Sequence, residues 1–307
     1  MRRDVAALHI HSIHSIHSIH SIHSIHSPDI RRDVAALHIH SMKKTLHLFK
    51  IGGAILEDNK ELEETLAFFS NLPGRKLLVH GGGRRASRMS RQLGIEPKLH
   101  EGRRITDAAT LEVVVMVYAG LENKKVVSML QALGCNAIGL SGADGNVILA
   151  AKRPVKDIDY GYVGDVKTIN TQSLAALLEA GMTPALCAIT HDGKGQLLNT
   201  NADTIAAELA IALTAQYQAN LYYCFEKPGV MTDLDNTDSV IRFLDPELYA
   251  AYRQQGIIAE GMIPKLDNAF RALKAGAASV QVGDRKSLAL GRATQLVWTT
   301  DFPESNI

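Results

Sequence analysis

Strand-like and helix-like runs alternate along the chain from Thr45 onward, and this alternation limits the available folds more than any other feature. Extended runs are expected at 45–51 and 76–80, and helical runs follow them at 61–72 and 84–93. Strands that alternate with helices typically form a parallel sheet with crossover helices. The sequence therefore predicts an α/β fold.

The rest of the chain continues this pattern with one antiparallel insertion. A long helix is expected at 107–133, capped by Asp107 and broken near Gly120. The runs "NVILAAKRP" and "GYVGDVKTIN" have the alternation and turn spacing of an antiparallel pair. Further helices are predicted at 171–180, 203–214, 246–255 and 263–275, and further strands at 184–189, 220–225 and 278–282. We expect a mixed, mainly parallel sheet.

The first 41 residues do not have the pattern of a globular domain. They contain a His-Ser-Ile tripeptide repeat, nine of the 13 histidines and two copies of "RRDVAALHIHS". Such a segment is more typical of an appended or mistranslated leader than of a domain, and a native metal-binding tract is the alternative. We therefore expect the native chain to begin at Met42.

Composition narrows the function classes. The 33 basic and 32 acidic residues balance, so nothing global favours a nucleic acid or an anionic membrane as partner. The three cysteines are widely spaced in apolar surroundings, which predicts buried thiols in a reducing cytoplasm. No uncharged apolar run approaches the roughly 20 residues of a membrane span. We expect a cytoplasmic protein that acts on small molecules.

A lysine interrupts the first predicted strand. Lys50 stands between Phe49 and Ile51 in "LHLFKIGG", and Gly52 and Gly53 follow directly. Glycine lets the backbone approach another group closely, and free backbone N–H groups beside a lysine suit an anion such as phosphate. A surface lysine beside an ordinary turn is the alternative.

A second glycine cluster follows the next strand. In "LLVHGGGRR", Gly81, Gly82 and Gly83 lie between a predicted strand and a predicted helix, where N–H groups can bind an anion. A tight turn that needs positive φ would explain the glycines equally well. Neither cluster has the spacing of a Walker A loop or of a dinucleotide-binding GxGxxG motif.

Two further stretches carry polar residues at predicted helix starts. In "LLNTNADT", Asn199, Asn201 and Asp203 alternate and would point to one side of an extended segment, although capping alone could explain Asp203. In "EGMIPK", Pro264 suits a first helical turn and Lys265 follows it.

Together these stretches resemble the amino acid kinase family, and most closely its acetylglutamate kinase branch. The resemblance covers nearly all of 45–283, in order: "KIGG", "VHGGG", "EGRRIT", "YVGDV", "LLNTNAD", "GVMTD" and "EGMIPK". It implies a three-layer αβα sandwich around a mainly parallel sheet. It also implies an N-terminal lobe at 42–194 for the acyl-amino acid and for dimerisation, and an ATP-binding lobe at 195–307. The boundary is placed at the loop "THDGKGQ".

The resemblance also assigns roles to residues. Lys50 would neutralise the transferring phosphoryl group, Lys265 the leaving ADP, and Asp203 would hold both lysines. Gly53 and Gly82 would donate backbone N–H groups to the phosphoryl group. The acyl-amino acid would be bound by Gly81, Gly82, Arg104, Asn199 and Asn201, and the nucleotide by Lys50, Lys265 and Gly229.

The implied reaction is ATP-dependent phosphorylation of an N-acyl-L-glutamate in arginine biosynthesis. N-acetyl-L-glutamate is the first choice and N-succinyl-L-glutamate a close second, since a basic residue in "KLHEGRR" could favour succinyl. Mg²⁺ would enter with ATP, held by phosphate oxygens and water, and the sequence offers no dedicated acidic cage. Another phosphotransferase of the superfamily, such as a carbamate kinase, and a catalytically silent regulatory homologue are the alternatives.

Two features depart from the family pattern. The chain has Phe225, Glu226 and Lys227 where these kinases usually carry a short Thr-Asp or Ser-Asp segment before the nucleotide site. The few residues between Met42 and the first strand leave no room for the extra helix that links dimers of arginine-regulated members into hexamers. We therefore expect a homodimer that is insensitive to arginine.

Overall fold

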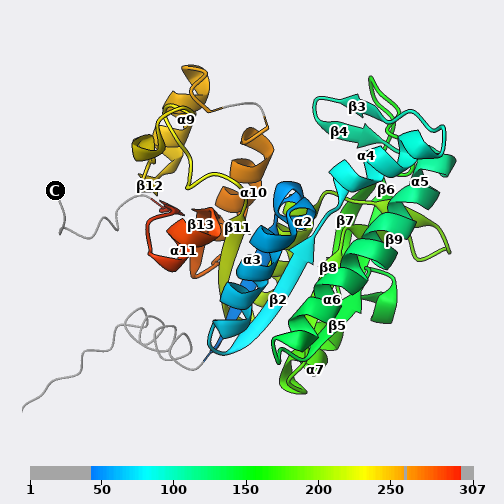
Figure 1. Cartoon of the computed structure of the whole chain (residues 1–307), viewed down its shortest axis with the longest axis horizontal. Helices are drawn as coiled ribbons and strands as arrows, with labels where there is room; N and C mark the ends of the chain where they lie inside the picture. Colours follow the sequence, from blue (N-terminus) through cyan, green and yellow to red (C-terminus); the bar gives the residue numbers. More distant parts are fainter. Residues whose placement is uncertain (1–42, 259–260, 299–307) are drawn as a thin grey trace, which may run out of the picture. The chain divides into compact units, whose positions relative to one another are not determined.

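The computed structural model describes residues 43–258 and 261–298 (Figure 1). The predicted leader at 1–41 lies outside the described residues. The strands are β1 (Lys44–Ile51), β2 (Arg75–His80), β3 (Lys98–His100), β4 (Arg103–Ile105), β5 (Ala137–Leu140), β6 (Ile148–Lys152), β7 (Gly164–Ile169), β8 (Thr183–Cys187), β9 (Ile189–His191), β10 (Leu197–Asn199), β11 (Tyr217–Cys224), β12 (Phe243–Leu244), β13 (Ser279–Gly283) and β14 (Thr294–Leu296).

The helices connect these strands. The α-helices are α2 (Gly53–Glu57), α3 (Asn59–Asn71), α4 (Gly83–Gln92), α5 (Ala108–Val115), α6 (Asn123–Ala132), α7 (Thr171–Glu179), α8 (Ala202–Leu213), α9 (Pro246–Gln254), α10 (Ile263–Lys274) and α11 (Arg285–Ala289). A π-helical segment, η1 (Met116–Glu122), joins α5 to α6, and short 3₁₀ turns lie at η2 (Asp144–Asn146) and η3 (Thr237–Ser239).

The largest sheet confirms the predicted α/β class. Its strand order is β12-β14-β13-β11-β1-β2-β8-β5, and the pairs from β13 to β5 are all parallel. Only β13 and β14 pair antiparallel within it. The predicted antiparallel pair is β6 and β7, which belongs to a second sheet of order β10-β9-β6-β7.

Alternate side chains of β1 face the two helical layers of the sandwich. Leu46 and Leu48 pack in one buried cluster with α8 and α10, whereas Phe49 and Ile51 pack in another with α3 and α6. Side chains two residues apart in a strand share a face, so Lys50 lies on the α8 side of the sheet.

Three predicted elements differ in the structure. The strand expected at 184–189 ends at Cys187, and β9 continues the chain in the second sheet. The helix expected at 107–133 contains the π-helical segment around Gly120, while Asp107 caps α5 as predicted by accepting from Thr110 N. The charged stretch through Arg104, for which no strand was predicted, forms the β3–β4 hairpin.

The predicted lobe boundary at 194 lies in the turn between β9 and β10, which pair antiparallel. It stays a prediction.

Candidate functional site

The site is built where neighbouring parallel strands end. Lys50 of β1 pairs in register with Val79 of β2 and with Tyr223 of β11. Lys50 and the glycine turns that follow β1 and β2 therefore lie at the same edge of the sheet, next to the end of β11. In open α/β sheets, ligands bind outside the carboxyl ends of the strands.

Lys50 is a buried cation with a buried partner. Its side chain points toward α8, where the Nζ atom lies 2.6 Å from Oδ1 of Asp203. Lys50 is only 8% exposed, so this lysine is not the surface residue of the alternative interpretation. An ammonium group this buried requires a compensating charge.

Asp203 also binds Lys265. Lys265 lies in the first turn of α10 and donates from Nζ to the same Oδ1 atom at 3.1 Å. The alternative explanation of Asp203 as a helix cap is wrong, because Asn201 caps α8 by accepting from Thr204 N. The common direction expected for an extended segment does not apply to Asp203, since helix α8 begins at Ala202, whereas Asn199 and Asn201 both line the cavity that adjoins this cluster. Asp203 is thereby free to hold both lysines.

The charges of this cluster shift the pKa values of Asp203 and Lys265. Burial would raise the pKa of Asp203, but the ammonium groups of Lys50 and Lys265 hold it well below its usual range. Burial and the nearby Lys50 ammonium lower the pKa of Lys265 to about 8, although Asp203 opposes the shift. The cluster keeps an excess of positive charge near neutral pH, which suits a polyanionic ligand.

The end of β11 and the unusual segment that follows it place aromatic rings beside this cluster. The Lys265 ammonium lies 5.3 Å from the ring centroid of Tyr223 and 5.7 Å from that of Phe225. Such contacts stabilise a cation when it is partly desolvated. Glu226 lies 3.8 Å from Arg84, which follows the second glycine cluster.

The glycine turns differ in conformation. Gly53 opens the short helix α2 with Gly52 as its N-cap. Gly82 is the N-cap of α4 and has φ 152°, a conformation that favours glycine. A Cβ on Gly82 would lie 2.7 Å from Cδ1 of Tyr118, so the turn also needs glycine for space.

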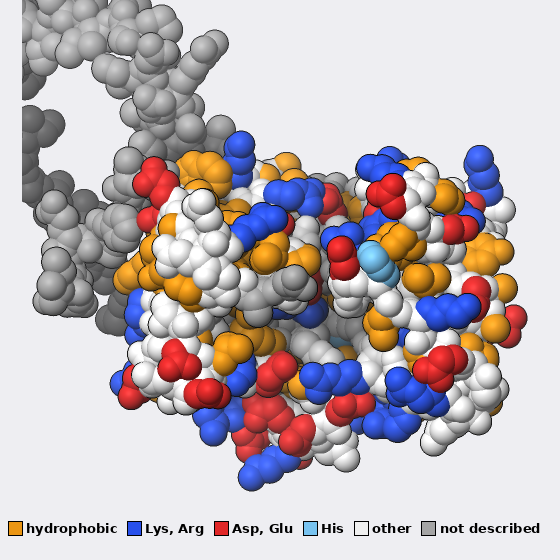
Figure 2. Space-filling model, turned by 90° about the horizontal axis from the view of Figure 1, so that it is seen from above, with side chains coloured by type: hydrophobic (Ala, Val, Ile, Leu, Met, Phe, Trp, Pro, Cys, Tyr) orange, Lys and Arg blue, Asp and Glu red, His pale blue; other side chains and the backbone are white. Residues whose placement is uncertain are grey.

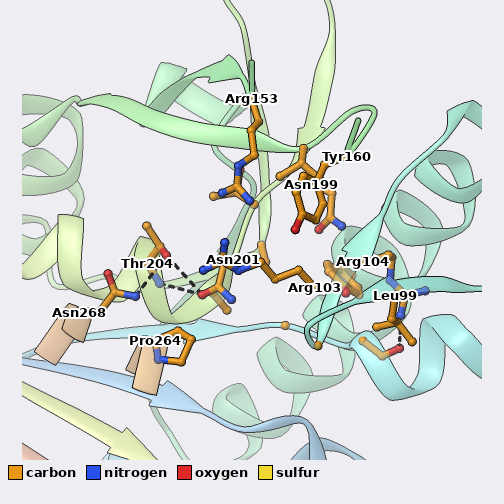
Figure 3. Close-up of a pocket in the computed structure, with 18 of the residues that line it drawn as sticks. Leu99, Arg103, Arg104, Arg153, Tyr160, Asn199, Asn201, Thr204, Pro264 and Asn268 are labelled. Carbon is orange, nitrogen blue, oxygen red and sulfur yellow. Dashed lines mark hydrogen bonds between the residues drawn. The ribbon is translucent and has the colours of Figure 1, made fainter. Parts of the chain in front are cut away.

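A cavity of about 620 Å³ adjoins the cluster. Figure 2 shows this edge of the protein hollowed near its centre, with basic and acidic side chains around the hollow. Figure 3 shows Arg103, Arg104, Tyr160 and Asn199 on one side of the cavity and Asn201, Thr204 and Asn268 on the other. Its volume suits a small polar substrate.

Arg104 is fixed at the cavity wall. Its Nη2 atom donates to the Gly83 carbonyl at 2.8 Å and to Ser87 Oγ at 2.7 Å. Its Nη1 atom is buried, and no hydrogen-bond partner for it occurs among the described residues. A held guanidinium with a free donor can bind a carboxylate. The neighbouring Arg103 is exposed and also lines the cavity.

The remaining predicted site residues are placed as follows. Gly81, Asn199 and Asn201 line the cavity, and Asn199 donates from Nδ2 to Thr106 Oγ1 at 3.0 Å. Gly229 is buried elsewhere, where a Cβ would lie 2.6 Å from Thr294 Oγ1. Its predicted nucleotide contact stays a prediction and could be made only through its backbone.

Sequence reasoning missed several cavity residues. Tyr118, Arg153 and Tyr160 line the cavity, and the Arg153 guanidinium lies over the Tyr160 ring while it donates to Asp165. The quoted motif "YVGDV" contains Asp165, which was the one available signal for the Arg153 pair.

The described residues contain neither a metal-binding cluster nor a membrane-spanning helix. Within 43–258 and 261–298, no group of three or more His, Cys, Asp or Glu side chains is arranged to hold a metal ion. None of the helices in that part of the chain has the length and apolarity needed to cross a bilayer.

The lysine–aspartate–lysine cluster thus lies at the carboxyl ends of strands in a mainly parallel sheet. Residues 46–284 match the amino acid kinase family, and the chain belongs to that family. It is 56% identical over 241 residues to an acetylglutamate kinase from Phocaeicola vulgatus. The aligned region covers 78% of this chain and 94% of that protein. The chain is thus an acetylglutamate kinase-like phosphotransferase.

Solved structures agree on the fold. The structure of smu.665 from Streptococcus mutans has a TM-score of 0.70 at 25% identity, covering 82% of this chain and 98% of that one. A carbamate kinase from Giardia has a TM-score of 0.58 at 12% identity, covering 84% and 99% of the two chains. The second likeness concerns the fold alone.

Proposed function

We propose that the protein transfers the γ-phosphoryl group of ATP to the side-chain carboxylate of an N-acyl-L-glutamate, with N-acetyl-L-glutamate as first choice. The products are the acyl phosphate and ADP, and the proposed pathway is arginine biosynthesis. The observation that carries the proposal is the buried Lys50–Asp203–Lys265 cluster beside a cavity walled by Arg104. The 56% identity to an acetylglutamate kinase supports the choice of acceptor.

Charge neutralisation is the proposed source of catalysis. Phosphoryl transfer spreads negative charge over the equatorial and bridging oxygens, and fixed cations stabilise that charge. Lys50 would neutralise the transferring group and Lys265 the leaving ADP, while Asp203 positions both. Backbone N–H groups of Gly53 and Gly82 would add hydrogen bonds. A base is unnecessary, because a carboxylate with a pKa of about 4.3 is already ionised at neutral pH.

Arg104 is the proposed partner of the substrate α-carboxylate. Its fixed guanidinium has one buried donor group to spare. The backbone of Gly81 and Gly82 and the side chains of Asn199 and Asn201 would complete the pocket, although Asn201 also caps α8.

The acyl group is the open part of the substrate. Arg103 and Arg153 both line the cavity. Arg153 is neutralised by Asp165 at 2.7 Å, whereas Arg103 forms no ion pair with any described residue. A succinyl carboxylate would give Arg103 a partner, which keeps N-succinyl-L-glutamate a close second.

Mg²⁺ would enter with ATP. Asp203 is already shared by two ammonium groups, and the described residues offer no acidic cluster around it. The chain therefore fits an ion held mainly by phosphate oxygens and water, where it screens phosphate charge.

ATP as donor and three buried free thiols suit the cytoplasm, and we propose a homodimer as the working form.

The test is ADP release from Mg-ATP with N-acetyl-L-glutamate and N-succinyl-L-glutamate supplied in parallel. We expect turnover with one acceptor that Lys50→Ala abolishes and that Lys44→Ala retains. Lys44 is the matched control, because it lies on the same strand but pairs with Glu179 at the surface.

Failure of the assay separates the alternatives. ADP release with carbamate but with neither acyl-glutamate would support a different kinase of the superfamily. ATP binding without turnover on any acceptor would support a regulatory homologue.

Arg103→Gln should weaken only the succinyl reaction.

A further inference from the structure

A fully buried histidine ends strand β2. His80 has no exposed surface and precedes the three glycines of the second turn. Burial lowers its pKa to about 4, so the ring is neutral under physiological conditions. A neutral imidazole donates from one nitrogen and accepts at the other, and its partners decide which.

Asn123 fixes the tautomer of His80. The Asn123 side-chain Nδ2 donates to the Ala185 carbonyl at 2.9 Å and lies 3.0 Å from His80 Nε2. Its Oδ1 accepts from Lys124 Nζ at 3.2 Å, which agrees with this orientation of the amide. A carbonyl cannot donate, so Nδ2 must face Ala185, and Nε2 of His80 must accept.

The hydrogen on His80 therefore sits on Nδ1. This atom lies 2.9 Å from the Gly81 carbonyl oxygen, to which it donates. The Gly81 carbonyl and the Gly82 N–H belong to one planar peptide unit and point in opposite directions. A bond that holds the carbonyl therefore also sets the direction of the Gly82 N–H. No acceptor for that N–H occurs among the described residues.

The π-helical segment η1 supplies the other support of this peptide. Its Tyr118 ring packs against Gly82 so closely that a Cβ there would lie 2.7 Å from Cδ1. Asn123 is the first residue after the segment ends. Segments of π-helix are rare and occur frequently at functional sites. Here one such segment places both Tyr118 and Asn123 against the glycine turn.

We infer that His80, oriented by Asn123, is a positioning residue that fixes the Gly81–Gly82 peptide so that the Gly82 N–H points at the transferring phosphoryl group. The inference rests on the proposed kinase function. His80 does not touch the substrate and transfers no proton. Its contribution is to remove reorganisation of the donor during the reaction.

Two substitutions at the same position separate the roles of the ring nitrogens. Asparagine places an amide donor near the position of Nδ1, whereas glutamine reaches only the position of Nε2. We expect His80→Gln to lower kcat by about 10- to 100-fold, with the KM for the acyl-glutamate changed less than about threefold. His80→Asn should recover most of this loss.

His47→Gln is the matched control. His47 is also a buried histidine of the large sheet, on β1, and its Nδ1 lies 3.1 Å from Tyr222 Oη. We expect this variant to lower Tm without lowering kcat. If His80 had a purely structural role, His80→Gln would likewise lower Tm without lowering kcat. His80→Asn would then lower Tm by the same amount.

Equal kcat values for wild type, His80→Gln and His80→Asn would overturn the inference, as would equal losses in both variants. If His80→Gln does not fold, Asn123→Leu provides the second test, since it leaves Nε2 without its donor. We expect about a tenfold lower kcat there, and a wild-type kcat would contradict the inference. Failure of the proposed function itself is distinct, because wild type would then release no ADP with either acyl-glutamate.

Discussion

One carboxylate oxygen holds two ammonium groups at the edge of the central sheet. Oδ1 of Asp203 lies 2.6 Å from Lys50 Nζ and 3.1 Å from Lys265 Nζ. The side chains of the three residues are between 10% and 19% exposed, so water screens these charges only weakly. Asp203 therefore keeps two like charges side by side before any ligand binds.

Replacing this carboxylate should damage both stability and activity. Asp203→Asn leaves two buried ammonium groups without their partner, and we expect a loss of about 3 kcal/mol in the free energy of unfolding. ADP release should fall at least about 100-fold, because both lysines lose their orientation. Asp245→Asn is the control, since asparagine can also cap α9. Wild-type stability and activity in Asp203→Asn, measured by urea unfolding and ADP release, would refute this account.

The depressed pKa of Lys265 predicts a pH dependence. The pKa of about 8 in the free protein means that kcat/KM for Mg-ATP should fall as pH rises through about 8. Between about pH 8 and 10.4 the unfolded chain binds more protons at Lys265 than the folded chain does, so the contribution of this group to the free energy of unfolding rises with pH while activity falls. The loss of activity above about pH 8 is therefore not caused by unfolding.

Lys265→Arg provides the check, because a guanidinium keeps its charge across this range. The residual activity of that variant should show no decline near pH 8. A wild-type profile that is flat from pH 7 to 10, or the same decline in the arginine variant, would count against the assignment.

Part of this residue-level arrangement was predictable, and part was not. Lys50 and Lys265 were singled out by the resemblance of the ordered motifs to the amino acid kinase family, since each stretch alone also fits a surface lysine. The role of Asp203 depended on which residue caps α8, and sequence alone does not choose between Asn201 and Asp203. Arg153 was missed although the predicted antiparallel pair contains both Arg153 and Asp165, because the pairing alone does not show that these strands line the cavity.

At the scale of elements, the turn from β2 into α4 determines where the backbone donors point. Its three supports are the His80 hydrogen bond, the Tyr118 ring and the positive φ of Gly82. The alternation of strands and helices predicted this turn. The break expected near Gly120 falls within the π-helical segment, but its π-helical geometry and the placement of Tyr118 were not predicted.

Two glycines with positive φ test the turn directly. Gly82→Ala should cost about 3 kcal/mol of unfolding free energy, because the new Cβ meets the Tyr118 ring as well as the unfavourable φ. Gly94→Ala should cost only about 1 kcal/mol, since Gly94 has φ 76° with open space around it. If urea unfolding gave equal losses of unfolding free energy for Gly82→Ala and Gly94→Ala, the close contact with Tyr118 would not be what requires glycine at position 82.

At the scale of the whole molecule, the described chain is a three-layer sandwich with its site at the carboxyl ends of β1, β2 and β11. The alternation of elements predicted the mainly parallel sheet, and the resemblance to the amino acid kinase family implied the three layers. The position of the second sheet was not predicted, since β8 and β9 read as one apolar run although they belong to different sheets.

Assembly is a further prediction at this scale. We expect a dimer of about twice the 33.3 kDa chain mass, with no inhibition of ADP release by L-arginine. Light scattering with and without arginine provides the measurement. A hexamer, or inhibition by arginine, would contradict it.

The central claim is that a carboxylate accepts the phosphoryl group, and trapping of the product tests it most directly. Acyl phosphates react with hydroxylamine to give a hydroxamate, so the enzyme is incubated with Mg-ATP, N-acetyl-L-glutamate or N-succinyl-L-glutamate, and hydroxylamine. We predict hydroxamate formation in step with ADP release, and neither product with Lys50→Ala. ADP release without hydroxamate from either acyl-glutamate would contradict the account.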